Sequence, residues 1–237
     1  MAIPSPTALT RHPHLVETPA RGHIRVDMHV HCLYSGDSTT TIDELAESII
    51  DAGIDVVCLT DHHATRGVAP LAQALDAAGQ RVIAGEEIRT HTGEIIGLFM
   101  TERIPFGLTA RETATAIRGQ GGIVYIPHPF DPMRRNITED SLRDLAEEGL
   151  IDAIEVINAK TSLSSLNARA LEFARAYKLA EGAGSDAHVP FAVGAAVAEI
   201  PDFTDAKSFL AALSSSTTRG HHWDEARPWT ARIVPAT

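Results

Sequence analysis

Histidine, aspartate and glutamate recur in this sequence directly after short apolar runs. They occupy a series of motifs along the chain: His29 and His31 in DMHVH, Asp37 in YSGD, His62 in LTDHH, Glu87 in GEEI, Glu94 in TGEIIGLF, His128 in PHPF, and Asp186 and His188 in GSDAH. Imidazole and carboxylate groups are ligands of zinc, manganese or iron, and no thiolate is needed. One HxH pair alone is a weak signal, but the whole set predicts a site for several divalent cations.

The apolar runs that precede these motifs have the length and composition of buried strands. Strands are predicted at 24–28, 54–59, 81–84, 94–100, 122–126, 151–157, 179–183 and 197–200, and helices at 41–52, 68–78, 109–118, 138–148 and 163–177, with 206–213 closing the pattern. Continuous apolar strands between amphipathic helices indicate a parallel sheet covered by helices. About seven such repeats favour a closed or nearly closed barrel, in which functional residues lie at the carboxyl ends of the strands. The motifs lie at those ends.

The length and composition of the chain predict its domain organisation. The chain has 237 residues, of which 44% are hydrophobic, and its candidate ligands run from residue 29 to residue 188 without a linker. We therefore predict one domain over 23–237, preceded by a Pro-rich extension over 1–22 that lies on the surface or is disordered. No apolar run is long enough for a membrane span, and residues 1–17 lack the apolar region of a secretory signal.

Two further properties concern location and partners. Cys32 and Cys58 give no disulfide framework and indicate reduced thiols in a cytoplasmic protein. The formal net charge of −11, without a long basic patch, disfavours long nucleic-acid substrates.

The order DMHVHCLYSGDS, LTDHH, GEEI, PHPF and GSDAH resembles the PHP (polymerase and histidinol phosphatase) family of phosphoesterases over about residues 25–190. This resemblance implies a distorted (β/α)7 barrel that binds two or three divalent metal ions, with manganese, iron or zinc as candidates. One metal would take His29, His31, Glu87 and Asp186; a second would take Asp37, His62 and His188; a third would take His128, Glu87 as a bridge, and one more ligand.

That last ligand is where this chain departs from related members, which often have histidine in a run such as HILG. Aligning the glycine of that run with Gly97 places Glu94 at the histidine position. Glutamate can bind a metal, but it is harder and negatively charged, so the metal preference and occupancy of the third site stay open. The alternative is an exposed glutamate at the start of a strand.

A site of this kind suits the hydrolysis of a phosphate ester. We expect a metal-bridging hydroxide as nucleophile, Glu87 as the bridging carboxylate, and Asp186 or His188 as a proton acceptor or donor. The phosphate would be bound by non-metal groups, for which the candidates are Arg134, Arg135, Lys160 and His63. Only one of the two arginines is expected to face the site, and the pair could instead be solvated.

Four functions remain open at this stage. The first is hydrolysis of a phosphate monoester on a small metabolite or nucleotide, and the second is a phosphodiesterase acting on short oligonucleotides or cyclic phosphates. The third is a non-catalytic, metal-stabilised module, and the fourth is a C–N hydrolase on a similar barrel. The negative charge favours the first over the second.

Some polar residues have simpler interpretations. Asp27 and Asp61 are expected to hydrogen-bond metal-binding histidines, and the glycines of EGAGSDAH to relieve crowding near the metals. The histidines without a strand context are expected at the surface: His12, His14, His23, His221 and His222.

Overall fold

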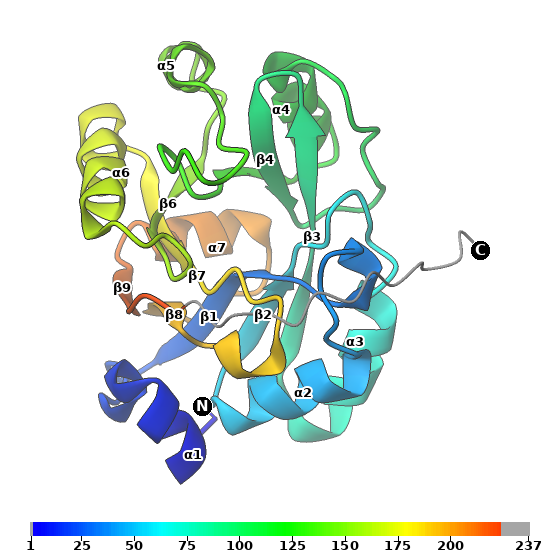
Figure 1. The fold of residues 1–237 in the computed structure, drawn as a ribbon, viewed down its shortest axis with the longest axis vertical. Helices are drawn as coiled ribbons and strands as arrows, with labels where there is room; N and C mark the ends of the chain where they lie inside the picture. The colour runs from blue at the N-terminus through cyan, green and yellow to red at the C-terminus, as the bar shows by residue number, and fades with distance from the viewer. Residues whose placement is uncertain (1, 224–237) are drawn as a thin grey trace.

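The computed structural model of the protein describes residues 2–223, which form nine strands and seven α-helices (Figure 1). The strands are β1 (His23–Val30), β2 (Val56–Leu59), β3 (Arg81–Thr90), β4 (Gly93–Leu98), β5 (Ile123–Ile126), β6 (Ala153–Asn158), β7 (Ala180–Gly184), β8 (Ala196–Pro201) and β9 (Thr217–Gly220). The helices are α1 (Pro6–Arg11), α2 (Ile42–Asp51), α3 (Val68–Leu75), α4 (Ala110–Gly119), α5 (Glu139–Glu147), α6 (Ser164–Tyr177) and α7 (Ala206–Leu213).

The strands β1 to β7 form a nearly closed barrel. They are hydrogen-bonded in sequence order, and β8 and β9 extend the sheet beyond β1. Beyond the end of β7, the chain turns onto β1: Asp186 N–H donates to His29 O at 2.7 Å, and His31 N–H donates to Ala187 O at 2.9 Å. The predicted α/β barrel is therefore confirmed, and its closure brings the GSDAH motif against the DMHVH motif.

Two strands, β4 and β8, run against the direction expected from the sequence, and β8 pairs antiparallel with β1. Strand β4 pairs antiparallel with both β3 and β5, whereas the neighbouring pairs β1–β2, β2–β3, β5–β6 and β6–β7 are parallel. Strands β3 and β4 form a hairpin in which Thr90 pairs with Gly93. The start of β4 consequently lies at the carboxyl end of the parallel strands, and this places Glu94 at the same end of the barrel as the other motifs.

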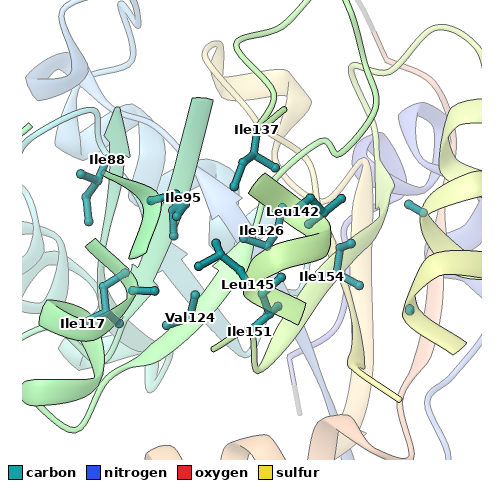
Figure 2. Close-up of a cluster of buried hydrophobic side chains, with 14 of the residues drawn as sticks. Ile88, Ile95, Ile117, Val124, Ile126, Ile137, Leu142, Leu145, Ile151 and Ile154 are labelled. Atoms are coloured by element: carbon teal, nitrogen blue, oxygen red, sulfur yellow. The ribbon is translucent and has the colours of Figure 1, made fainter. Parts of the chain in front are cut away.

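Alternate residues of the strands pack on opposite sides of the sheet, as the period of a strand requires. Val124 and Ile126 of β5 pack against α4 and α5 outside the barrel (Figure 2), while Ile123 and Tyr125 pack into its interior. The helices begin at defined caps: Thr41 and Thr109 each form a capping box with the glutamate three residues later. These starts agree with the predicted helices over 41–52 and 109–118.

The N-terminal segment, which the sequence suggested is on the surface or disordered, is ordered, and most of its residues are exposed or partly exposed. After α1, a 3₁₀ turn spans Pro13–Val16, and the side chain of Leu15 is 2% exposed. Leu15 packs in a hydrophobic cluster with residues of α2 and α3, such as Leu45 and Leu71. Among residues 2–223, no helix has the length and apolar character needed to cross a membrane.

Candidate metal centre

Four side chains from distant parts of the chain meet at the carboxyl end of the barrel. The Nε2 atoms of His29 and His31, both on or just after β1, lie 3.0 Å apart. Glu87 Oε2 from β3 lies 3.4 Å from His29 Nε2 and 3.3 Å from His31 Nε2. Asp186 Oδ1, from the turn after β7, lies 3.5 Å from His31 Nε2. All four residues are buried, and they form the first cluster.

The donor atoms of the first cluster fit a divalent cation. Asp186 Oδ1 is buried and has no hydrogen-bond partner among residues 2–223, although three imidazole nitrogens and Lys160 Nζ lie within 3.7 Å of it. Buried polar groups are normally paired, so an orphaned carboxylate oxygen beside nitrogen atoms indicates a shared ligand. Two imidazoles and two carboxylates are ligand types that a divalent ion binds.

A second cluster lies beside the first and nearer to solvent. His188 Nε2 lies 3.0 Å from Asp37 Oδ2, and His62 Nε2 lies 3.5 Å from the same oxygen. His31, His62 and His188 also offer nitrogen atoms that lie close enough together to hold a metal ion. The three residues assigned to a second metal by resemblance therefore come together in the fold.

The third cluster shares Glu87 with the first. His128 Nε2 lies 3.0 Å from Glu87 Oε1 and 3.9 Å from Glu94 Oε2. The other oxygen of Glu87 lies 3.1 Å from His62 Nδ1. The two oxygens of Glu87 thus face different groups of ligands, as a bridging carboxylate requires. Glu94 is 5% exposed, so the alternative of an exposed strand-start glutamate is wrong.

The charges of the centre shift the pKa values of its acids in opposite directions. Burial raises the pKa of Asp186, but the positive charges of Arg134 and Lys160 outweigh it and hold the pKa well below its usual range. For Glu94, burial and then the charge of Glu87 raise the pKa to about 7. Glu94 is therefore the acid of the centre that most needs a cation to stay ionised at neutral pH.

The backbone at the centre adopts uncommon conformations. His63, His128 and Asp186 have φ angles of 54°, 29° and 52°, in the left-handed region that residues other than glycine seldom adopt. Such conformations cost on the order of 1–3 kcal/mol each and cluster at functional sites. Here they turn the side chains of His128 and Asp186 toward the clusters.

A buried carboxylate that was not among the predicted site residues contacts several parts of the centre. Glu155, in the middle of β6, is fully buried. Its Oε1 lies 3.1 Å from His29 Nδ1, and its Oε2 accepts hydrogen bonds from His128 N–H at 2.6 Å and Asn158 Nδ2 at 2.9 Å. A hydrogen bond at Nδ1 fixes the orientation of His29 and leaves its Nε2 for the first cluster. The available signal was the acidic Glu155 between the apolar residues of the run AIEVI.

Asp27 and Asp61 were expected to hydrogen-bond metal-binding histidines. Neither aspartate contacts an imidazole nitrogen of these histidines directly. Asp27 accepts hydrogen bonds from backbone N–H groups. Asp61 accepts from the backbone N–H and the thiol of Cys32, and it also hydrogen-bonds Ser35, whose Oγ lies 2.8 Å from His31 Nδ1. Asp61 therefore reaches His31 only through Ser35.

A cavity of about 470 Å³ opens over the second and third clusters. Its walls include the four residues predicted to bind substrate: His63, Arg134, Arg135 and Lys160. Arg134 also pairs with Asp186 Oδ2, and Lys160 Nζ lies 3.1 Å from His188 Nδ1. Both arginines line the cavity, whereas only one was expected to do so. A cavity of this size suits a small ligand.

Comparison with known proteins identifies the family. The model of the PHP domain matches residues 27–120, and that of a PHP-associated segment matches residues 164–218. An uncharacterized protein of Methanocaldococcus jannaschii is 34% identical over 207 residues, which is 82% of this chain and 81% of that protein. The chain belongs to the PHP family. The matched segments contain every residue of the three clusters except His128; Asp186 and His188 fall within the PHP-associated segment.

Solved structures show the same PHP fold at low sequence identity. A two-domain protein from Bacteroides vulgatus, described as containing a predicted PHP-like metal-dependent phosphoesterase, has a TM-score of 0.69 and 16% identity, covering 86% of this chain and 67% of that one. A protein from Bifidobacterium adolescentis, described as a candidate metal-dependent phosphoesterase, has a TM-score of 0.60 and 18% identity, covering 74% and 90%. These similarities support the barrel fold.

Proposed function

We propose that this PHP protein is a metal-dependent hydrolase that cleaves a phosphate monoester on a small metabolite or nucleotide. One observation carries the proposal: the second and third ligand clusters, which lie beside the first, open onto a cavity whose walls carry Arg134, Arg135 and Lys160. Imidazole and carboxylate ligands suit divalent cations, and the guanidinium and ammonium groups suit the oxygens of a phosphate. The structural neighbours described as metal-dependent phosphoesterases support the same reaction class.

Bound divalent cations would neutralise the phosphate and lower the pKa of water, so that a nucleophile forms near neutral pH. The residues of this chain hold the cations, bind the phosphate and move a proton. Glu87 faces two groups of ligands with its two oxygens and can hold two cations close together. Arg135 and Lys160 can bind phosphate oxygens from the cavity wall. His188 lines the cavity and is placed to move a proton to or from the ester.

The monoester is favoured over the diester by size and charge. The cavity volume of about 470 Å³ suits a small substrate, and the chain's net charge of −11 opposes a long polyanion. An amide substrate is less well matched, because a neutral amide offers no anionic group for the cationic side chains of the cavity wall. Manganese, iron or zinc as the metal, and a cytoplasmic location, stay predictions from the sequence.

A comparison of two chromogenic substrates tests the proposal. The full chain, loaded with Mn²⁺, is assayed with p-nitrophenyl phosphate and with bis(p-nitrophenyl) phosphate. We expect a higher kcat/KM for the monoester. A preference for the bis ester would support the diesterase alternative, and turnover of neither, despite bound metal, would contradict a phosphoesterase.

The variant Arg135→Ala tests the role of the cavity wall. Arg135 is exposed to the cavity and is not one of the candidate metal ligands. Loss of a charge-assisted hydrogen bond to phosphate should raise KM and lower kcat/KM by about 10-fold or more, with unchanged metal content. Lys207→Ala, an exposed change on α7, is the matched control and should leave both quantities unchanged.

A further inference from the structure

An exposed aromatic side chain lies beside the cavity and belongs to none of the three clusters. Phe106, in the loop between β4 and α4, is 65% exposed. Its ring packs against the ring of His63, which lines the cavity, with a centroid separation of 5.2 Å and an interplanar angle of 47°. Phe106 therefore continues the wall of the cavity outward from His63.

The ring of His63 connects Phe106 to the second cluster. The ring centroids of His62 and His63 are 6.2 Å apart, and His63 also makes the contact with Phe106. A phosphate bound at the second cluster is thus separated from Phe106 by the width of the His63 ring. A part of the substrate that reaches Phe106 must therefore be carried at a distance from the phosphate, on a spacer.

The loop that carries Phe106 is fixed on both sides of this residue. Ile104 is buried among residues of α4 and α5, and its N–H donates to Glu86 Oε2 at 2.8 Å. The N–H of Gly107 donates to Arg89 O, on β3, at 2.9 Å. Because the backbone is held at both points, the exposed ring is preorganised, and a ligand that packs against it loses little affinity to the ordering of the loop.

The backbone of His63 is held in place as well. Its φ angle of 54° lies in the left-handed region, its N–H donates to Glu87 O at 3.1 Å, and its carbonyl accepts from Arg103 Nη1 at 3.1 Å. Arg103 belongs to the same loop as Phe106, so this hydrogen bond ties the segments of the two rings together. A strained backbone that its surroundings maintain in this way supports a functional role for the position of the ring.

A second exposed apolar side chain lines the cavity itself. Met133, in the loop that also carries Arg134 and Arg135, is 85% exposed. Methionine adapts its shape to a ligand and makes favourable contacts with aromatic rings. The cavity thus combines cationic groups that suit a phosphate with apolar groups that suit the rest of a ligand, as small-molecule sites commonly do.

We propose that Phe106 and His63 bind a planar aromatic ring in the alcohol part of the substrate, as in a nucleoside 5′-phosphate, where a sugar separates the ring from the phosphate. This inference rests on the proposed function and narrows its substrate class. Aromatic rings pack favourably in offset and edge-to-face arrangements, and every nucleobase has a face that stacks on an aromatic side chain. A ring esterified directly to the phosphate would meet His63 but not Phe106.

Two substrates that differ in the ring test the inference. Adenosine 5′-monophosphate and ribose 5-phosphate carry the same phosphorylated primary alcohol, so the base adds binding and not reactivity. We expect the Mn²⁺-loaded full chain to have a kcat/KM about 10-fold or more higher for adenosine 5′-monophosphate. Phe106→Ala should remove most of this preference by raising KM for the nucleotide at unchanged kcat. Its constants for ribose 5-phosphate and p-nitrophenyl phosphate should stay unchanged, because neither places a ring at Phe106.

Further variants separate an aromatic contact from a merely apolar one. Phe106→Tyr keeps the ring and should keep the preference, whereas Phe106→Leu should lose most of it. Phe191→Ala is the matched control, because Phe191 is an exposed phenylalanine that packs against Arg11 and does not line the cavity. It should keep the full preference for the nucleotide.

Equal kcat/KM values for the two substrates in the unsubstituted chain would overturn the inference and leave the phosphoesterase proposal intact. An equal loss for both substrates in Phe106→Ala, or a loss of preference in Phe191→Ala, would likewise overturn the role given to Phe106. No turnover of these substrates or of p-nitrophenyl phosphate, despite bound metal, would contradict the proposed function and the inference with it.

Discussion

At the scale of single residues, the metal centre depends on Glu155, a buried carboxylate that is not itself a candidate ligand. Glu155 lies against the donors of His29, His128 and Asn158. Because one of these donors is the imidazole Nδ1 of His29, Glu155 determines which nitrogen of that ring faces the first cluster. The same carboxylate positions the backbone of His128 in the third cluster.

The variant Glu155→Gln should therefore weaken metal binding without removing a ligand. A neutral amide offers only one acceptor oxygen, so it cannot serve all three donors, and affinity for Mn²⁺ should fall about 10- to 100-fold. Calorimetric titration of the metal-free chain with Mn²⁺ measures this. Glu148→Gln, which alters a surface pair with Arg111, should leave the affinity unchanged. Equal affinity in Glu155→Gln would show that His29 needs no such partner.

At the scale of secondary-structure elements, the close approach of β7 to β1 positions the first cluster. A Cβ atom on Gly184, at the end of β7, would lie 2.3 Å from His29 Cβ and 2.6 Å from Glu155 Oε1. Only glycine permits this contact, which confirms that a glycine of EGAGSDAH relieves crowding at the site. The turn that follows carries Asp186 directly into the cluster.

Gly184→Ala should consequently displace His29 and destabilise the chain. Overpacking of a buried site costs about 1–3 kcal/mol, and the displaced ligand should also lower Mn²⁺ affinity. Chemical denaturation and metal titration measure the two effects. Gly119→Ala is the matched control, because a Cβ there meets no atom within 4 Å, and it should lower neither the stability nor the Mn²⁺ affinity. Normal metal affinity in Gly184→Ala would contradict the role given to this contact.

The elements also show how far sequence can predict this fold and site. The candidate ligands were found because imidazole and carboxylate groups follow apolar strands, and the chemistry of a motif is visible locally. The direction of β4 was not predicted, since its apolar pattern is the same in a parallel and an antiparallel strand. Its reversal at the hairpin nevertheless explains why Glu94 reaches the third cluster.

Contacts between residues far apart in sequence were the least predictable. Glu155 and His29 are 126 positions apart, and nothing near either residue indicates the other. The order of the N-terminal segment was also hard to predict, because α1 is only six residues long and is held in place by tertiary contacts of the segment, such as the packing of Leu15. The same tertiary contacts bury His12.

At the scale of the whole molecule, the N-terminal segment makes folding stability depend on pH. The pKa of His12 is about 4 in the folded chain, mainly because of burial, and about 6.5 when unfolded. Above pH 6.5, the ring is neutral in both states and its stabilising contacts are fully present. As the pH falls from 6.5 toward 4, the unfolded chain binds a proton that the folded chain does not, so stability falls.

We expect His12 to contribute a loss on the order of 3 kcal/mol in the free energy of unfolding between pH 6.5 and pH 4. Urea denaturation of the metal-free chain across this range should show a smaller pH dependence in His12→Asn than in the unsubstituted chain. His91→Asn, at an exposed position, should keep the original dependence. An identical slope in His12→Asn would show that His12 is not held neutral by the fold.

The central claim is that distant strand ends converge to bind two or three divalent cations that make the chain a phosphoesterase. Its most direct test is a titration of the metal-free full chain with Mn²⁺, in which bound metal and hydrolysis of p-nitrophenyl phosphate are measured on the same samples. We predict no turnover without metal, and turnover that rises with occupancy until two or three ions are bound per chain. Turnover in the metal-free chain, or full metal occupancy without hydrolysis of any phosphate ester, would contradict the account.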